Sequence, residues 1–123
     1  MGVASELDML GDGQLKIDRL GRCVWLRDHL VSLSPNEFDV LVYLAQHAGH
    51  VVTSDELLHE VWHYSPQMGG TKNQVRCCLK RLQRKLAVLP DGRSCIFTVR
   101  GHGWRMATDE EWWGSRANIV RRL

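Results

Sequence analysis

The 123-residue sequence predicts an α+β domain with an N-terminal antiparallel sheet, three helices and a C-terminal β-hairpin. Three observations predict this order. Short apolar runs separated by turn residues precede residue 34. Three segments headed by Ser or Thr then follow, each with the spacing of a helix N-terminus. Near the C-terminus, two apolar segments enclose a turn with two glycines. The length suits one domain with a single core.

The first predicted elements are three short strands. The apolar runs are Leu15–Ile17, Cys23–Leu26 and Leu30–Leu33. Polar turn residues separate them, and these spacings are typical of a small antiparallel meander. Residues 1–14 contain glycines and no sustained period, so we expect a flexible N-terminus there.

Two helices are predicted next. Ser34 and Glu37 have the spacing of a capping box, in which each residue bonds the backbone N–H of the other. Apolar residues then recur at helical spacing until Gly49. Thr53 and Glu56 repeat the box and begin a second, shorter helix.

A third helix is predicted after a polar loop at residues 63–70. Thr71 and Gln74 form its box. One narrow apolar stripe follows, made of Val75, Leu79, Leu82 and Leu86. At about 100° per residue, the residues that fall almost opposite the stripe are Asn73, Cys77, Lys80 and Arg84. The helix therefore buries one edge and presents a basic, hydrogen-bonding edge.

The last predicted elements form a hairpin. Cys95–Val99 reads as a strand, residues 100–103 as a tight turn and Trp104–Met106 as the returning strand. We expect the domain at residues 15–106, followed by a C-terminal extension at 107–123. Thr108 and Glu111 have the spacing to begin one more short helix there.

Charge is segregated along the chain, although its net value is only +2. Residues 1–60 hold ten acidic and four basic side chains, whereas residues 61–106 hold nine basic side chains and Asp91 alone. Concentrating one sign of charge destabilises a folded chain through self-repulsion, and the usual reason for it is a polyanionic partner.

Three helices with a basic third one, followed by a hairpin, form the order of a winged helix-turn-helix. A helix of about 10–12 Å diameter fits the major groove of DNA, and the hairpin reaches the backbone or the minor groove. Several ordered signatures resemble the OmpR/PhoB-type winged helix-turn-helix DNA-binding effector domains of bacterial response regulators. They lie at residues 33–38, 49–58, 61–62, 79–86 and 98–105. The resemblance implies a four-stranded N-terminal sheet, with the additional strand in the region of Leu7–Leu15.

The resemblance also implies roles for individual residues. The third helix reads bases, here through Asn73, Gln74, Cys77, Cys78 and Arg81, while Lys80 and Arg84 contact phosphates. Thr98 and Arg100 match wing positions that contact DNA, and the loop between the second and third helices meets RNA polymerase. We assign Trp62, His63, Tyr64 and Gln67 to that loop. The backbone N–H groups near Thr71 suit a phosphate as well, and a phosphate contact by His102 is a further candidate.

This chain departs from the family pattern at several positions. The usual Val-Asp-Val-His of the third helix is Val75-Arg76-Cys77-Cys78, and Gln83, His63 and Trp104 replace an Arg, a Gly and a Tyr. These departures leave the fold prediction intact but change the groups that face the bases. No phosphoacceptor receiver domain precedes residue 15, so the chain is either an excised effector or a standalone relative.

Two other classes of function remain as alternatives. A winged helix can serve as a protein–protein interaction module, for which the acidic first half or Trp112 and Trp113 would supply a surface. His59, Glu60 and His63 match the His-Glu-x-x-His pattern of zinc hydrolases, in which two His on one helix face bind the metal. A third ligand is not apparent, so we expect no metal, no cofactor and no catalysis.

The remaining expectations concern cysteines and location. None of the four cysteines forms a Cys-x-x-Cys pair, and we expect them to be reduced. Cys77 and Cys78 on a basic helix suggest a redox switch; the competing interpretation is that both are small packing residues or contact a thymine methyl group. No apolar run reaches the roughly 18 residues of a membrane span and no signal peptide is visible. We therefore expect a cytoplasmic regulator that binds duplex DNA, with RNA polymerase and a second copy on tandem half-sites as further partners.

Overall fold

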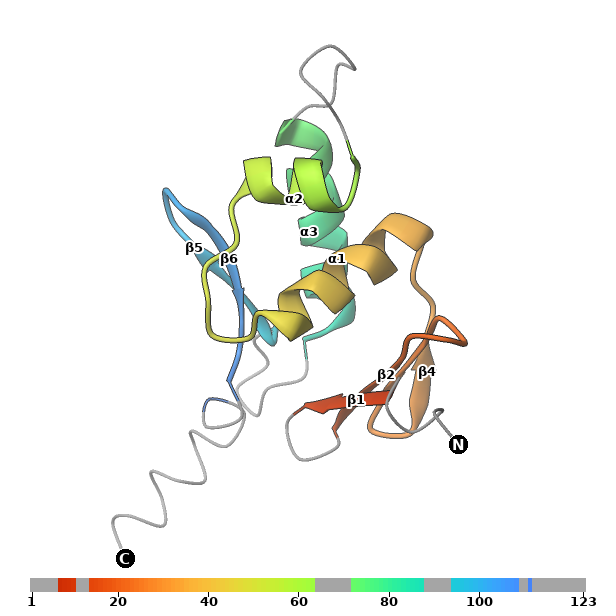
Figure 1. The fold of residues 1–123 in the computed structure, drawn as a ribbon. Coiled ribbons are helices and arrows are strands. Elements are labelled where there is room, and N and C mark those ends of the chain that lie inside the picture. Colours follow the sequence, from red (N-terminus) through yellow and green to blue (C-terminus); the bar gives the residue numbers. More distant parts are fainter. Residues whose placement is uncertain (1–6, 11–13, 64–71, 88–93, 109–110, 112–123) are drawn as a thin grey trace, which may run out of the picture.

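Two antiparallel sheets lie against three helices in the computed structural model, which describes residues 7–10, 14–63, 72–87, 94–108 and 111 (Figure 1). The N-terminal sheet has the strand order β1-β2-β3-β4, and the C-terminal hairpin pairs β5 with β6. The elements in chain order are β1 (Leu7–Leu10), β2 (Leu15–Asp18), β3 (Cys23–Leu26), β4 (His29–Val31), α1 (Pro35–Gln46), α2 (Ser54–Glu60), α3 (Lys72–Lys85), β5 (Ile96–Val99) and β6 (Gly103–Met106). The predicted winged helix-turn-helix order is confirmed.

The N-terminal sheet has one strand more than the residue pattern alone predicts. β1 pairs with β2 in an antiparallel register that places Met9 opposite Lys16, as the family resemblance implies. Side chains alternate between faces, so Leu15 and Ile17 are fully buried while Lys16 between them is partly exposed. The buried face contributes to the single core shared with the helices.

The capping box predicted for the first helix is fully formed. The Glu37 N–H donates to Ser34 Oγ at 3.2 Å, and the Ser34 N–H donates to Glu37 Oε1 at 3.1 Å. The helix ends before Gly49, whose φ of +87° favours glycine and whose N–H donates to the Met106 carbonyl at 3.0 Å. This bond attaches the end of α1 to the wing.

At the start of the second helix, the Glu56 side chain has a different partner from the one that the predicted capping box gives it. The Glu56 N–H donates to Thr53 Oγ1 at 3.1 Å, as expected. The Glu56 carboxylate accepts a hydrogen bond from the Tyr43 hydroxyl of α1. That bond raises the pKa of Tyr43 to about 12, and burial adds to the shift. The acidic cap residue therefore ties α2 to α1.

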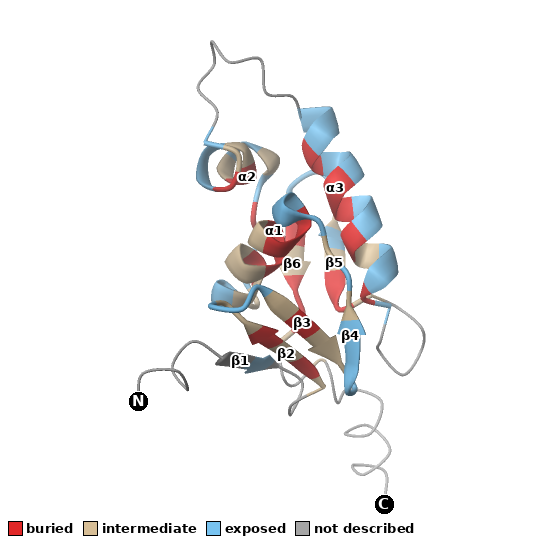
Figure 2. Ribbon diagram, turned by 90° about the vertical axis from the view of Figure 1, so that its right-hand side faces the viewer, coloured by how far each residue is buried: buried red, intermediate tan, exposed pale blue. Residues whose placement is uncertain are grey.

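The third helix packs against α1 and α2, with its buried residues toward α1 and its exposed residues on the opposite side (Figure 2). Val75, Leu79 and Leu82 are fully buried, as the stripe predicts. The wing is bonded to the segment that joins α1 to α2: the Val52 N–H donates to the Trp104 carbonyl at 2.7 Å, and the Trp104 N–H donates back at 2.9 Å.

Two described residues after β6, Thr108 and Glu111, are bonded to each other, and Glu111 is bonded to the wing. Thr108 and Glu111 form the reciprocal bonds of a capping pair, with the Thr108 N–H 2.9 Å from Glu111 Oε1. Glu111 also makes a two-point ion pair with the Arg105 guanidinium at 2.6 and 2.8 Å. Hydrogen bonds from Arg105 lower the pKa of Glu111 to about 2, against the opposing effect of burial. Arg105 is therefore held by the chain itself.

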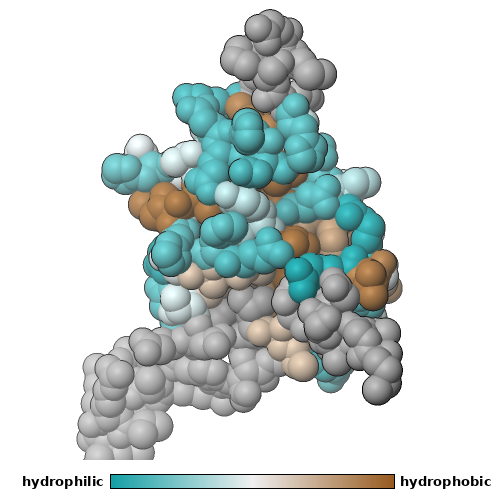
Figure 3. Space-filling view, in the orientation of Figure 1, coloured by the Kyte–Doolittle hydropathy of each residue, from teal (hydrophilic) through white to brown (hydrophobic). Residues whose placement is uncertain are grey.

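Hydrophobic side chains do not form one broad patch on the described residues of the face that carries α1 and α2. Figure 3 shows this face as largely hydrophilic, with separate small hydrophobic areas. Within the described ranges, no helix combines the length and apolar content that crossing a membrane requires.

Candidate nucleic-acid interface

The exposed edge of α3 carries the residues that the sequence predicts for it. Asn73, Cys77, Lys80 and Arg84 are all exposed and lie within about 60° of one another around the helix axis. We call these four residues the central line of α3. No acidic residue occurs anywhere in the helix.

The six cations of α3 fall into paired and unpaired groups. Arg81 and Lys85 bond to Glu37 of α1, and Lys72 lies 3.8 Å from Asp55 of α2. Among the described residues, the three without an ion pair or a side-chain hydrogen bond are Arg76, Lys80 and Arg84. These three recur every four residues, so they form one row along the helix. The positive charge available to a polyanion is therefore concentrated on the central line and on the side toward the wing.

Glu37 is the buried charge that pairs Arg81 and Lys85, since its side chain is only 2% exposed. Lys85 Nζ donates to Oε1 at 2.7 Å and Arg81 Nε donates to Oε2 at 3.1 Å, in addition to the cap bond from Ser34. Burial alone would raise the pKa of this carboxyl, but the hydrogen bonds from Lys85, Ser34 and Arg81 outweigh it and lower the pKa. We call Glu37, Arg81 and Lys85 the clamp; it fixes α3 against α1.

Two predicted base-reading residues lie elsewhere than expected. Cys78 is 1% exposed, because it falls beside Val75 and Leu79 on the buried side of the helix, and the prediction that it reaches a base edge is wrong. Burial also raises the pKa of its thiol to about 11, which argues against a reactive thiolate at this position. Arg81 was expected at the base edges, but its side chain is directed to the buried Glu37 carboxylate.

The different exposure of Cys77, Cys78 and Cys95 predicts how fast each thiol reacts. We expect iodoacetamide at pH 8 to alkylate Cys77 in the native protein, while Cys78 and Cys95 react only after unfolding. Both are essentially inaccessible, and burial raises the pKa of Cys95 to about 12. Peptide mapping by mass spectrometry of the native chain and of Cys77→Ser separates the adjacent thiols. Rapid labelling of the α3 peptide in Cys77→Ser would contradict the buried position of Cys78.

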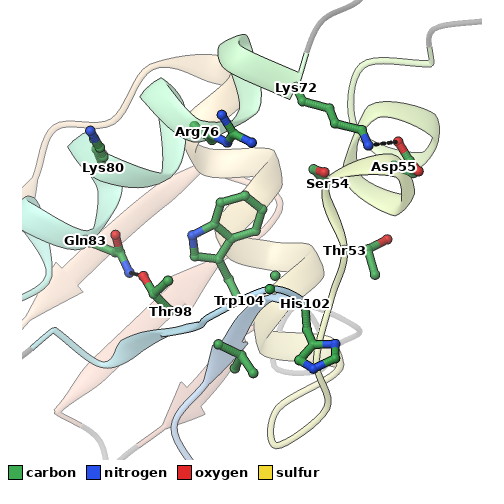
Figure 4. A pocket seen from close by; sticks show the side chains of 13 residues that line it. Thr53, Ser54, Asp55, Lys72, Arg76, Lys80, Gln83, Thr98, His102 and Trp104 are labelled. Carbon is green, nitrogen blue, oxygen red and sulfur yellow. Dashed lines mark hydrogen bonds and ion pairs between the residues drawn. The ribbon is translucent and has the colours of Figure 1, made fainter.

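A groove of about 570 Å³ separates α3 from the wing and the start of α2. Figure 4 shows Arg76 and Lys80 of α3 along one side, and Thr98 and His102 of the wing on the other. Trp104, only 9% exposed, lies between the two sides. Arg76 had no predicted contact and was noted only as a departure from the family pattern. The signal that could have predicted its place is the recurrence of a cation every four residues at Lys72, Arg76, Lys80 and Arg84.

The wing is joined to α3 by a residue that departs from the family pattern. Gln83 Nε2 donates to the Ile96 carbonyl at 3.0 Å and to Thr98 Oγ1 at 2.9 Å. Thr98 is exposed, so its hydroxyl lies at the surface while it accepts this bond. Arg100 and His102 are exposed in the turn, where the His102 N–H donates to the Val99 carbonyl at 2.9 Å. The structure thus brings the predicted wing residues and α3 to the same groove.

The His-Glu-x-x-His geometry is not formed. The helix α2 ends at Glu60, and His63 has a φ of +56°, so His59 and His63 do not share a helix face. Within the described ranges, no group of three or more His, Cys, Asp or Glu side chains is arranged to hold a metal ion. Trp62 is partly buried and His63 exposed, whereas the predicted loop residues Tyr64 and Gln67, like Thr71, lie outside the described residues.

With this geometry established, comparison with known proteins identifies the family. A family model described as "Transcriptional regulatory protein, C terminal" matches residues 28–106. The chain belongs to this family. The relatives and solved structures to which it is similar contain OmpR/PhoB-type response-regulator DNA-binding domains. This effector domain is 32% identical to the RstA DNA-binding domain of Klebsiella pneumoniae, solved in complex with the RstA box; the TM-score is 0.70 over 83% of this chain and 97% of that one.

Curated relatives of this effector domain are about twice its length. It is 35% identical over 98 residues to the DNA-binding response regulator MtrA of Mycolicibacterium smegmatis, covering 80% of this chain and 42% of that protein. It is likewise 35% identical over 103 residues to the transcriptional regulatory protein YclJ of Bacillus subtilis, covering 83% and 44%. The chain therefore spans less than half the length of these relatives.

Proposed function

We propose that this chain binds duplex DNA in a sequence-specific manner and regulates transcription as the effector part of a two-component response regulator. The observation that carries the proposal is the carboxylate-free exposed edge of α3, on which three cations have no ion pair within the described part of the chain and lie beside a basic wing. The RstA domain, which has the same fold, was solved with its DNA box. A helix of this kind fits the major groove, and a neighbouring hairpin reaches the flanking backbone.

The described residues divide into two kinds of contact under this proposal. Asn73 and Cys77, near the N-terminal end of α3, face the base edges. Phosphates are contacted by long cations that have no partner among the described residues, namely Arg76, Lys80 and Arg84 from α3 and Arg100 from the wing, and by the exposed His102 of the same turn. Arg81 belongs to the clamp and stabilises the orientation of α3 instead of reading a base.

The proposal extends to the domain limits and to further partners. Because β1 pairs with β2, we place the domain at residues 7–106, with 107–123 as an extension anchored through Glu111. RNA polymerase at the loop that includes Trp62 and His63, and a second copy of the chain on a tandem half-site, are the partners that such a regulator requires. A bacterial regulator of this kind acts in the cytoplasm, where the chromosome lies.

Lys80→Ala tests the phosphate contacts. We expect it to weaken binding to all duplexes alike and to reduce the slope of log affinity against log salt by about one unit, because one phosphate contact is lost. Fluorescence anisotropy across a salt series measures both quantities. Lys16→Ala, on the N-terminal sheet, is the matched control and should leave the slope unchanged. A Lys80→Ala slope equal to that of the unmodified chain would contradict this role, and salt-independent binding throughout would favour a protein-interaction module.

A further inference from the structure

The clamp and the wing leave one line of α3 free to enter a DNA groove. On one side of that line, Arg81 and Lys85 bond to Glu37, which holds this flank against α1. On the other side, Arg76 and Gln83 line the groove shared with the wing. The central line, Asn73, Cys77, Lys80 and Arg84, is therefore the exposed edge between these two flanks. Recognition helices of this type contact base edges with their N-terminal residues, which are Asn73 and Cys77 here.

The chemistry of these two side chains favours A·T base pairs. The Asn amide offers one donor and one acceptor, which match N6 and N7 of adenine in a two-point contact. The Cys thiol is only a weak donor and acceptor and behaves as a small apolar group, which suits the thymine methyl. Arg81, the guanidinium that the family resemblance assigns to the base edges, is bonded to Glu37, and the proposed function assigns Arg76 and Arg84 to phosphates.

The spacing of the two residues places their contacts on nearby base pairs. They are four residues apart, which is about 6 Å along the helix axis. Successive base pairs are roughly 3.4 Å apart, so the two contacts fall about two steps from each other when α3 lies along the groove.

We propose that Asn73 reads an adenine and Cys77 contacts a thymine methyl about two base-pair steps away, so that the operator half-site is A·T at both positions. This inference rests on the proposed function, since it requires that α3 enters the major groove. It names the class of sequence that the domain selects.

Base analogues test each contact separately, using the full chain and the half-site enriched from randomised duplexes. Replacing the thymine by deoxyuridine removes only its methyl group and should weaken binding about fourfold, the effect of one buried methyl-sized group. Replacing the adenine by 7-deazaadenine removes its N7 acceptor and should weaken binding about tenfold. Cys77→Ser should abolish the first response, and Asn73→Ala the second.

Matched variants away from α3 control for general effects. Cys23→Ser on the N-terminal sheet and Asn36→Ala on α1 should respond to both analogues as the unmodified chain does, and circular dichroism verifies that each variant folds. An enriched half-site with G·C at both positions, or analogue responses that persist in Cys77→Ser and Asn73→Ala, would overturn the base assignment and leave the regulator intact. Enrichment of no sequence would overturn both this inference and the proposed function.

Discussion

Removing both cations of the clamp is expected to lower the free energy of unfolding by about 3–5 kcal/mol, because Arg81→Ala with Lys85→Ala leaves the Glu37 carboxylate buried without a counter-charge. The measurement is urea unfolding followed by circular dichroism at pH 7. DNA binding at a temperature where the variant is folded should retain its sequence preference, since the proposed function assigns Arg81 to the clamp and not to a base.

The matched control uses two other cations of the same helix. Arg76→Ala with Lys80→Ala removes the same charge from α3, but neither side chain has a partner among the described residues. We expect a change in unfolding free energy within about 0.5 kcal/mol and a large loss of DNA affinity with a smaller salt slope. Equal stability losses in the two double variants would show that the clamp does not stabilise the helix orientation.

The clamp also predicts a pH dependence. The folded-state pKa of Glu37 is lowered from the ordinary value of 4.5, so its contribution is fully present above that pH and is lost as the pH falls through the folded-state pKa. The stability difference between the unmodified chain and the Arg81→Ala/Lys85→Ala variant should therefore be largest near neutrality and shrink below about pH 4.5. Unfolding curves at several pH values measure it. A difference that grows toward acid would contradict the direction of the pKa shift.

Gly103→Ala is expected to have the other large effect. It should lower the free energy of unfolding by at least about 3 kcal/mol and detach the wing from the segment that contains Val52. A Cβ at this position would lie 2.0 Å from the Val52 carbonyl oxygen, which is backbone and bonded to the Trp104 N–H. The φ of +153° adds strain for any other residue. Hydrogen exchange of the Val52 and Trp104 amides, with urea unfolding, measures the detachment.

Gly101→Ala is the matched control, because it introduces backbone strain without the steric clash that a Cβ makes at Gly103. Its φ is +81°, but a Cβ there would meet nothing within 4 Å. We expect the free energy of unfolding to fall by about 1–2 kcal/mol because of the left-handed conformation, while the backbone hydrogen bonds between Val52 and Trp104 are retained. A Gly103→Ala variant no less stable than Gly101→Ala would show that the wing does not depend on this close approach.

The local signals in the sequence predict the elements well because they depend on neighbouring residues. The box of Ser34 and Glu37 begins α1 as expected, and the stripe of Val75, Leu79 and Leu82 is the buried side of α3. The strand β1 has no apolar alternation of its own and followed only from the family resemblance. β1 is held by hydrogen bonds to β2, and the pattern of apolar residues along one segment does not reveal pairing with another strand.

The differences between the expected and the observed surroundings of residues in the candidate site arise from long-range contacts. Arg81 is placed by Glu37, 44 residues earlier in the chain, and nothing in the helical pattern reveals that partner. Cys78 lies at the edge of the stripe, where the angular position alone does not decide between burial and exposure. The same contacts make Arg76 and Lys80 the informative cations, because their neighbours leave them without a partner in the described part of the chain.

Selection of DNA sequences from a randomised duplex pool, followed by a salt titration on the enriched duplex, tests the central claim most directly. We expect an enriched motif with a repeated half-site. We also expect the affinity to fall steeply with salt, with a slope of log affinity against log salt of about −0.9 for each phosphate neutralised. Binding that enriches no sequence, or no binding at low salt, would contradict a sequence-reading regulator.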